Sequence, residues 1–159
     1  MLASKYAHRG IYDNKTVFEN TLSAFENAIN RNMAIELDLR ITKDKIIVVA
    51  HDADLKRLNG SKLNIASLTY EELKQYPFEN GDVIPMFSEL LSLVRGRVPL
   101  LIEVKYMTNN KEACMYIYEL LSDYKGEYAI QSFNPFVLTW FKRFTPNTLR
   151  GQLLMPINR

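Results

Sequence analysis

Strand-like and helix-like segments alternate along this chain of 159 residues, and the alternation restricts its fold more than any other feature. Runs of alternating or continuous apolar residues predict strands, and apolar residues spaced three and four positions apart predict helices. The predicted strands are residues 4–8, 33–40, 46–50, 98–105, 128–133 and 149–155. Helical patterns lie between them, mainly at 22–29, 88–94, 111–124 and 135–144. Strands that alternate with helices indicate an α/β fold, with a parallel sheet and helices packed outside it.

The number of predicted strands indicates an incomplete barrel. A closed eight-stranded barrel takes about 250 residues, so we expect a TIM (β/α)8-type barrel truncated to about six strands. We interpret residues 1–159 as one incomplete domain, in which 53–85 is an insertion-like segment with a short helix capped by Thr69 and Glu72. The connection 40–46 is too short for the crossover helix that parallel strands need. It forms either an antiparallel hairpin or an extended segment along the barrel wall.

Composition restricts the partners and the location of the protein. The chain has 20 basic and 18 acidic residues, and its net charge of +2 argues against a nucleic-acid partner. Its apolar runs are shorter than the roughly 18 residues of a membrane span, and its N-terminus lacks the apolar region of a signal peptide. Cys114 is the single cysteine, which excludes an internal disulfide and fits a reducing compartment. We therefore expect a small-molecule substrate, no nucleic acid, no membrane span and a cytoplasmic location.

Three acidic residues fall inside predicted strands. Glu36 and Asp38 are two positions apart, so both carboxylates point to the same face of the sheet, and Glu103 lies in a later strand. An unpaired charge inside a sheet is costly. In one reading these carboxylates form ordinary ion pairs, Glu103 with the lysine two residues later and the others with Arg9 or Arg40. In the other reading all three converge on a hard divalent cation, Ca²⁺ or Mg²⁺.

The two histidines of the chain, His8 and His51, each lie at the carboxyl end of a predicted strand. The carboxyl edge of the strands is where β/α folds place their active sites. A single histidine there is commonly a structural loop residue, but two of them with carboxylates nearby favour a functional site. Imidazole can serve as general base and general acid near neutral pH, and Arg9 and Lys105 would add positive charge for a phosphate. The residues therefore predict metal-assisted phosphoester chemistry.

Several short motifs follow one another along the chain. They are His8-Arg9-Gly10, Glu19-Asn20-Thr21, Ile35-Glu36-Leu37-Asp38, Val48-Val49-Ala50-His51-Asp52, Ile102-Glu103-Val104-Lys105 and Gln131-Ser132-Phe133. In this order and at this spacing the sequence resembles the glycerophosphodiester phosphodiesterase family, from residue 4 to about residue 155. The resemblance implies a TIM barrel that hydrolyses deacylated phospholipids such as glycerophosphocholine to sn-glycerol 3-phosphate and an alcohol. It also implies one divalent cation, Mg²⁺ or Ca²⁺.

The resemblance implies a role for each residue that matches a family motif. The implied residues are two catalytic histidines, three metal ligands and two phosphate-binding cations: His8 and His51; Glu36, Asp38 and Glu103; Arg9 and Lys105. In the implied reaction, a glycerol hydroxyl attacks the phosphorus to give a cyclic phosphate, which water then opens. His8 would be the base and His51 the acid that protonates the leaving alcohol. We expect Glu19 to orient Arg9, and either Asn20 or Thr21 to cap the first helix, with capping favoured over a site role for Asn20.

Domains of this family extend past the position of Arg159, so we expect open edges at the first and last strands and possible self-association through them. Three functions fit the residues at this stage. The first is a metal-dependent glycerophosphodiesterase. The second is a related enzyme, similar to a phosphatidylinositol-specific phospholipase or a sphingomyelinase D, with the same paired histidines and Glu-x-Asp pattern. The third is a catalytically incompetent fragment of such an enzyme.

Overall fold

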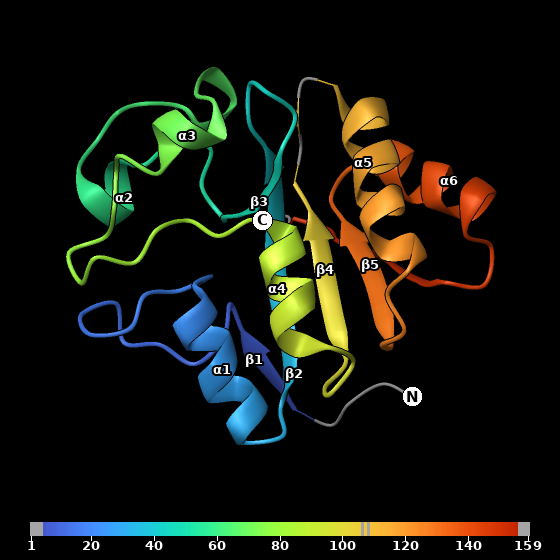
Figure 1. The fold of residues 1–159 in the computed structure, drawn as a ribbon. Helices are drawn as coiled ribbons and strands as arrows, with labels where there is room; N and C mark the ends of the chain where they lie inside the picture. Colours follow the sequence, from blue (N-terminus) through green and yellow to red (C-terminus); the bar gives the residue numbers. More distant parts are fainter. Residues whose placement is uncertain (1–4, 106, 108, 156–159) are drawn as a thin grey trace.

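The computed structural model describes residues 5–105, 107 and 109–155, and its elements alternate as the sequence predicts (Figure 1). The strands are β1 (Tyr6–His8), β2 (Ala34–Ile41), β3 (Ile47–Val49), β4 (Leu100–Val104), β5 (Tyr128–Ser132) and β6 (Leu149–Gln152). The helices are α1 (Leu22–Asn30), α2 (Lys56–Asn59), α3 (Tyr70–Leu73), α4 (Phe87–Val94), α5 (Asn110–Ser122) and α6 (Pro135–Phe144), with a 3-10 turn at Ile65–Ser67. The first predicted strand included residue 4, which lies outside the described residues.

All six described strands form one sheet. Five are parallel in the order β1-β2-β4-β5-β6, and β3 pairs antiparallel with the end of β2. The short connection 40–46 is therefore a hairpin, in which Arg40 pairs with Val48 and Lys45 has a positive φ of 70°. Within the described ranges β1 and β6 are the two edges of the sheet, so it forms an open part of a β/α barrel and not a closed one.

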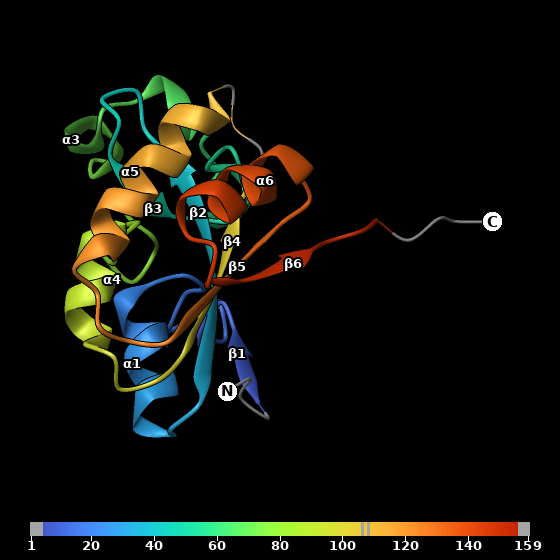
Figure 2. The same cartoon turned by 90° about the vertical axis from the view of Figure 1, so that its right-hand side faces the viewer.

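Helices cover one face of this sheet. In Figures 1 and 2, α1, α4 and α5 lie on the same side of the strands. Ile35, Leu37 and Leu39 of β2 point to this side and are fully buried together with Phe25 of α1 and Phe87 of α4. Complete burial of each such side chain contributes about 1.5–3 kcal/mol to stability. Because side chains alternate along a strand, this packing directs the even-numbered residues of β2 to the opposite face.

The insertion-like segment packs around a second, smaller core, which it shares with β3 and the connection between β1 and α1. The rings of Phe18 and Phe78 stack with their centroids 5.0 Å apart, and Val48 of β3 is buried in the same cluster. The predicted cap of α3 is present, since Thr69 and Glu72 exchange side-chain and backbone hydrogen bonds. This core fixes the segment, and with it α2, beside the connection between β1 and α1.

Candidate active site

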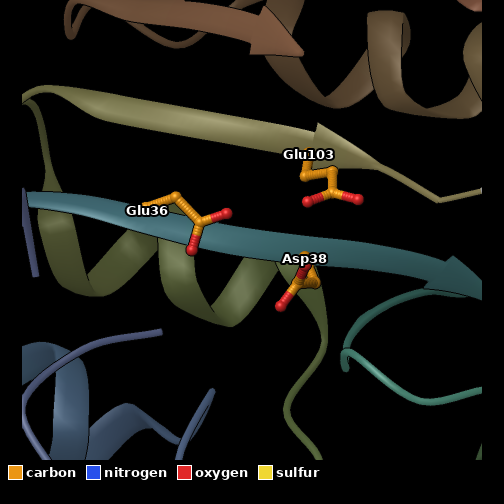
Figure 3. A group of neighbouring side chains, drawn as sticks. All are labelled: Glu36, Asp38 and Glu103. Atoms are coloured by element: carbon orange, nitrogen blue, oxygen red, sulfur yellow. The ribbon is translucent and has the colours of Figure 1, made fainter. Parts of the chain in front are cut away.

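Three buried carboxylates lie side by side on the face of the sheet opposite the helices. Glu36 and Asp38 come from β2 and Glu103 from β4, and Asp38 is the direct register partner of Glu103 (Figure 3). Each side chain offers an oxygen, and these three atoms all lie within 4.8 Å of one another. Each of the three residues is at most 7% exposed. The sequence-predicted acidic residues are thus brought together as a group that could hold a metal ion.

Among the described residues, lysine and arginine side chains form ion pairs with Asp38 and Glu103 but not with Glu36. The Nζ of Lys105 lies 2.6 Å from Glu103 Oε1 and 2.9 Å from Asp38 Oδ1, as expected for the Glu103–Lys105 ion pair. The Nε of Arg9 lies 3.3 Å from Asp38 Oδ2. Glu36 instead accepts from neutral donors, the amide of Gln131 at 3.1 Å and the backbone N–H of Arg9 at 3.3 Å.

The shortage of positive charge is centred on Glu36. Its burial, and then the negative charges of Asp38 and Glu103, raise its pKa to about 7. Carboxylate oxygens are the ligands that Mg²⁺ and Ca²⁺ prefer, and a divalent charge would relieve the repulsion among three buried carboxylates. The donor set of these residues therefore fits a hard divalent cation.

His8 ends β1, next to Glu36. Its Nε2 lies 3.9 Å from Glu36 Oε2, and its side chain is 66% exposed. Burial lowers the pKa of His8 and the Arg9 guanidinium lowers it further, while Asp38 and Glu19 act in the opposite direction. The net effect is a lowered pKa, which favours the neutral imidazole, and one ring nitrogen of a neutral imidazole can accept a proton.

His51 follows β3 and is held at two points. Its Nδ1 lies 2.7 Å from Asp52 Oδ1, and its backbone carbonyl accepts from Nε and Nη2 of Arg40 at 2.9 and 2.7 Å. Arg40 therefore orients the peptide of His51 as well as lying on the charged face of β2. His51 is close enough to His8 to contribute to the lowering of the pKa of His8.

The connection between β1 and α1 carries Arg9 and Asn20, which both have left-handed backbone conformations with φ of 58° and 57°. Of the two residues expected as the cap of α1, Asn20 is wrong and Thr21 is confirmed. Thr21 is the cap, since its Oγ1 accepts from the N–H of Ala24, while the amide of Asn20 donates to Asp38 Oδ2 at 3.0 Å. A helix start takes one capping side chain, and the adjacent threonine supplies it. Asn20 is thus free to orient a carboxylate of the acidic group.

Glu19 lies at the centre of a second network beside the acidic group. As expected, it accepts from Arg9, with Nη1 at 3.0 Å from Oε1. It also accepts from Asn14 Nδ2 at 3.1 Å and from both terminal nitrogens of Arg57. The sequence pattern predicted no role for Asn14, Arg57 or Gln131. Only Gln131 had a local signal, because it lies within a motif and on a predicted strand.

The fold and the site together define a class of protein: a β/α-barrel type with a buried acidic group and two histidines at the carboxyl edge of its strands. The sequence pattern of the glycerophosphoryl diester phosphodiesterase family matches residues 8–153, and the chain belongs to this family. None of the helices in the described ranges is long and apolar enough to cross a membrane.

Individual relatives agree with this assignment. The chain is 35% identical over 141 residues to the lysophospholipase D GDPD1 of Rattus norvegicus. The matched region covers 80% of this chain and 43% of that protein. It is 39% identical over 108 residues to a glycerophosphodiester phosphodiesterase of Bacillus altitudinis, covering 63% of this chain and 43% of that one. The chain thus spans less than half the length of these two relatives.

Solved structures agree on the fold. An Oleispira antarctica phosphodiesterase, determined in complex with its product sn-glycerol-3-phosphate, superimposes with a TM-score of 0.85 at 25% identity. The match covers 94% of this chain and 66% of that one. The open sheet described above therefore corresponds to the larger part of a family barrel.

Proposed function

We propose that this protein hydrolyses glycerophosphodiesters to sn-glycerol 3-phosphate and an alcohol, with Mg²⁺ or Ca²⁺ held by Glu36, Asp38 and Glu103. The observation that carries the proposal is the buried group of these three carboxylates, within 4.8 Å of one another, in a chain of this family. A bound divalent cation would supply the positive charge that draws electron density from a phosphoryl oxygen. The product named in the Oleispira structure supports glycerol 3-phosphate as the acid product.

Arg9 and Lys105 are the residues that would bind the phosphate. Lys105 lies against two carboxylates and Arg9 against Asp38 and Glu19, so both cations are held in place before a substrate arrives. Charged donors of this kind stabilise the negative charge that grows on phosphoryl oxygens in the transition state.

The two histidines would move the protons. His8 would take the proton of the glycerol hydroxyl as its oxygen forms a bond to phosphorus, and His51 would protonate the departing alcohol oxygen as its bond to phosphorus breaks. In the second step His51 would take a proton from water as the water oxygen bonds to phosphorus, and His8 would return its proton to the glycerol hydroxyl oxygen as the bond from that oxygen to phosphorus breaks. The Asp52 hydrogen bond at Nδ1 of His51 supports this assignment, because it leaves Nε2 for the reacting atoms.

Phosphorus NMR of glycerophosphocholine incubated with the chain tests the proposal. With Mg²⁺ or Ca²⁺ we expect a new phosphomonoester signal that EDTA abolishes, and we expect His51→Ala to reduce its rate by about 10²- to 10⁴-fold. Full activity of His51→Ala would refute the role of His51. No product with either ion would refute hydrolysis by this chain, and the third function above, an incompetent fragment, would then hold.

A second candidate substrate is a lysophospholipid, which is a glycerophosphodiester that keeps one acyl chain. Two observations favour it: the rat relative is named a lysophospholipase D, and Phe133 and Phe136 are 45% and 78% exposed just after β5. This apolar surface lies at the carboxyl edge of the sheet, where an acyl chain could lie. Choline release from lysophosphatidylcholine, compared with glycerophosphocholine at equal concentration, distinguishes the two substrates.

A further inference from the structure

Arg57, on α2 of the insertion-like segment, contacts two carboxylates at once. Its Nη1 and Nη2 lie 2.9 and 2.7 Å from the two oxygens of Glu19, and its Nε lies 2.6 Å from Asp52 Oδ2. Glu19 is buried and Asp52 half-buried, so these contacts reach below the surface although the Arg57 side chain is 45% exposed. No step proposed above uses this residue.

Both carboxylates lead directly to residues of the proposed reaction. The other oxygen of Asp52 lies 2.7 Å from Nδ1 of His51, and Glu19 Oε1 lies 3.0 Å from Nη1 of Arg9. A planar guanidinium holds its donors in a fixed fork, so the position of one carboxylate restrains the position of the other. Arg57 thus connects the proposed acid to the proposed phosphate-binding arginine.

Glu19 is kept ionised by this arrangement. Its burial acts to raise its pKa, but hydrogen bonds from Arg57 and Asn14 outweigh burial and lower the pKa to about 2. A carboxylate that stays charged gives Arg9 and Arg57 a common anchor. The contact between Arg57 and Asp52 likewise leaves one oxygen of Asp52 for His51.

We propose that Arg57 is a positioning residue, which holds Asp52 against Nδ1 of His51 and Glu19 against Arg9. Through Asp52 it fixes the ring orientation of His51 and holds a proton on Nδ1, so that Nε2, with the proton it carries when the ring acts as the acid, faces the leaving oxygen. This inference rests on the proposed function for its catalytic meaning. The alternative is an ion pair that only fastens α2 to the loop before α1.

Variants at this position separate the two roles. We expect Arg57→Gln to lower kcat for glycerophosphocholine about 10- to 100-fold, the usual effect of removing a residue that orients a site side chain. Arg57→Lys keeps the charge and one contact but not the fork, so we expect it to recover only part of the activity. Lys56→Ala is the matched control, since Lys56 is the exposed neighbour on the same helix, and its kcat should equal that of the unsubstituted protein.

Nitrogen-15 NMR of the two imidazoles reports on positioning without any turnover. In the metal-free, substrate-free protein at a pH where both rings are neutral, we expect His51 to show the pattern of a ring protonated at Nδ1. In Arg57→Gln the two nitrogen shifts of His51 should move toward each other, because both tautomers become populated. His8 serves as the internal reference, and Lys56→Ala should leave both rings unchanged.

Each outcome decides the question. An unchanged kcat and an unchanged His51 pattern in Arg57→Gln would overturn the inference. A lower kcat with an unchanged His51 pattern and a lower melting temperature would also overturn it, in favour of a fastening role. If the unsubstituted chain shows no turnover but Arg57→Gln still alters His51, the proposed function fails while the positioning of His51 stands. If Arg57→Gln does not fold, Arg57→Lys supplies the same comparison.

Discussion

Gly10 is the residue at which a single methyl group is expected to do most damage to the site. Its φ is +87°, and a Cβ built there would lie 2.7 Å from Ala24 Cβ and 2.8 Å from the Ala24 backbone carbon. We therefore expect Gly10→Ala to cost about 1–2 kcal/mol for the left-handed backbone and about 1–3 kcal/mol more for the overlap with α1. The second contribution cannot be relieved by a rotamer change, because a backbone atom is involved.

Gly60→Ala is the matched control for this prediction. Gly60 has a similar φ of +78°, but nothing lies within 4 Å of its Cβ position, so this variant measures the backbone cost alone. Urea unfolding of both variants, followed by circular dichroism, gives the difference in the free energy of unfolding. Equal destabilisation by the two substitutions would refute the argument from the Ala24 contact. Because Gly10 follows Arg9, we also expect Gly10→Ala to weaken turnover in the folded protein.

Three further predictions concern the acidic group, the buried thiol and acid stability. Glu103→Gln should weaken Mg²⁺ or Ca²⁺ binding, measured by calorimetry, at least tenfold. Glu112→Gln, which removes a partly exposed ion pair on α5, should leave the affinity unchanged, and equal affinities of the two variants would contradict the assigned ligands. Burial raises the pKa of the Cys114 thiol to about 12, so at pH 8 iodoacetamide should label it only after unfolding; mass spectrometry showing rapid labelling of the native protein would contradict this. The pKa of Glu19 is lowered from 4.5 to about 2, so its charge stabilises the fold above pH 4.5, and about 3 kcal/mol is lost as the pH falls toward 2. Glu19→Gln should therefore flatten the decline of unfolding free energy between pH 5 and pH 2, and an unaltered slope would show that Glu19 titrates normally.

The parts of this structure that depend on neighbours in the sequence could be predicted. The alternation in β2 placed Glu36 and Asp38 on one face, and the two histidines could be located because each lies at the carboxyl end of a strand. The hairpin after β2 could only be narrowed to two geometries, since the choice depends on pairing in three dimensions. Local pattern also could not choose between Asn20 and Thr21 as the helix cap, because both are good caps and only the position of Asp38 separates their roles.

The contacts of Arg57 show why the network around Glu19 could not be predicted from the sequence. Its partners Glu19 and Asp52 are 38 and 5 residues away, and α2 has neither a periodic pattern nor a capping side chain. The position of this helix is set by the small core in which Phe18 stacks on Phe78. A contact that depends on the packing of a whole segment leaves no local signal in the sequence.

The two faces of β2 explain how one strand serves both stability and chemistry. Its odd-numbered residues are apolar and pack against the helices, and its charged side chains lie at even positions on the opposite face. The charged face is costly by itself, because Lys105 and Arg9 balance only part of its negative charge and the pKa of Glu36 is raised to about 7. A ligand that binds the native state alone adds to its stability, so cation binding at this face should stabilise the fold as well as the reaction. Cation binding and folding should therefore be coupled at the acidic group.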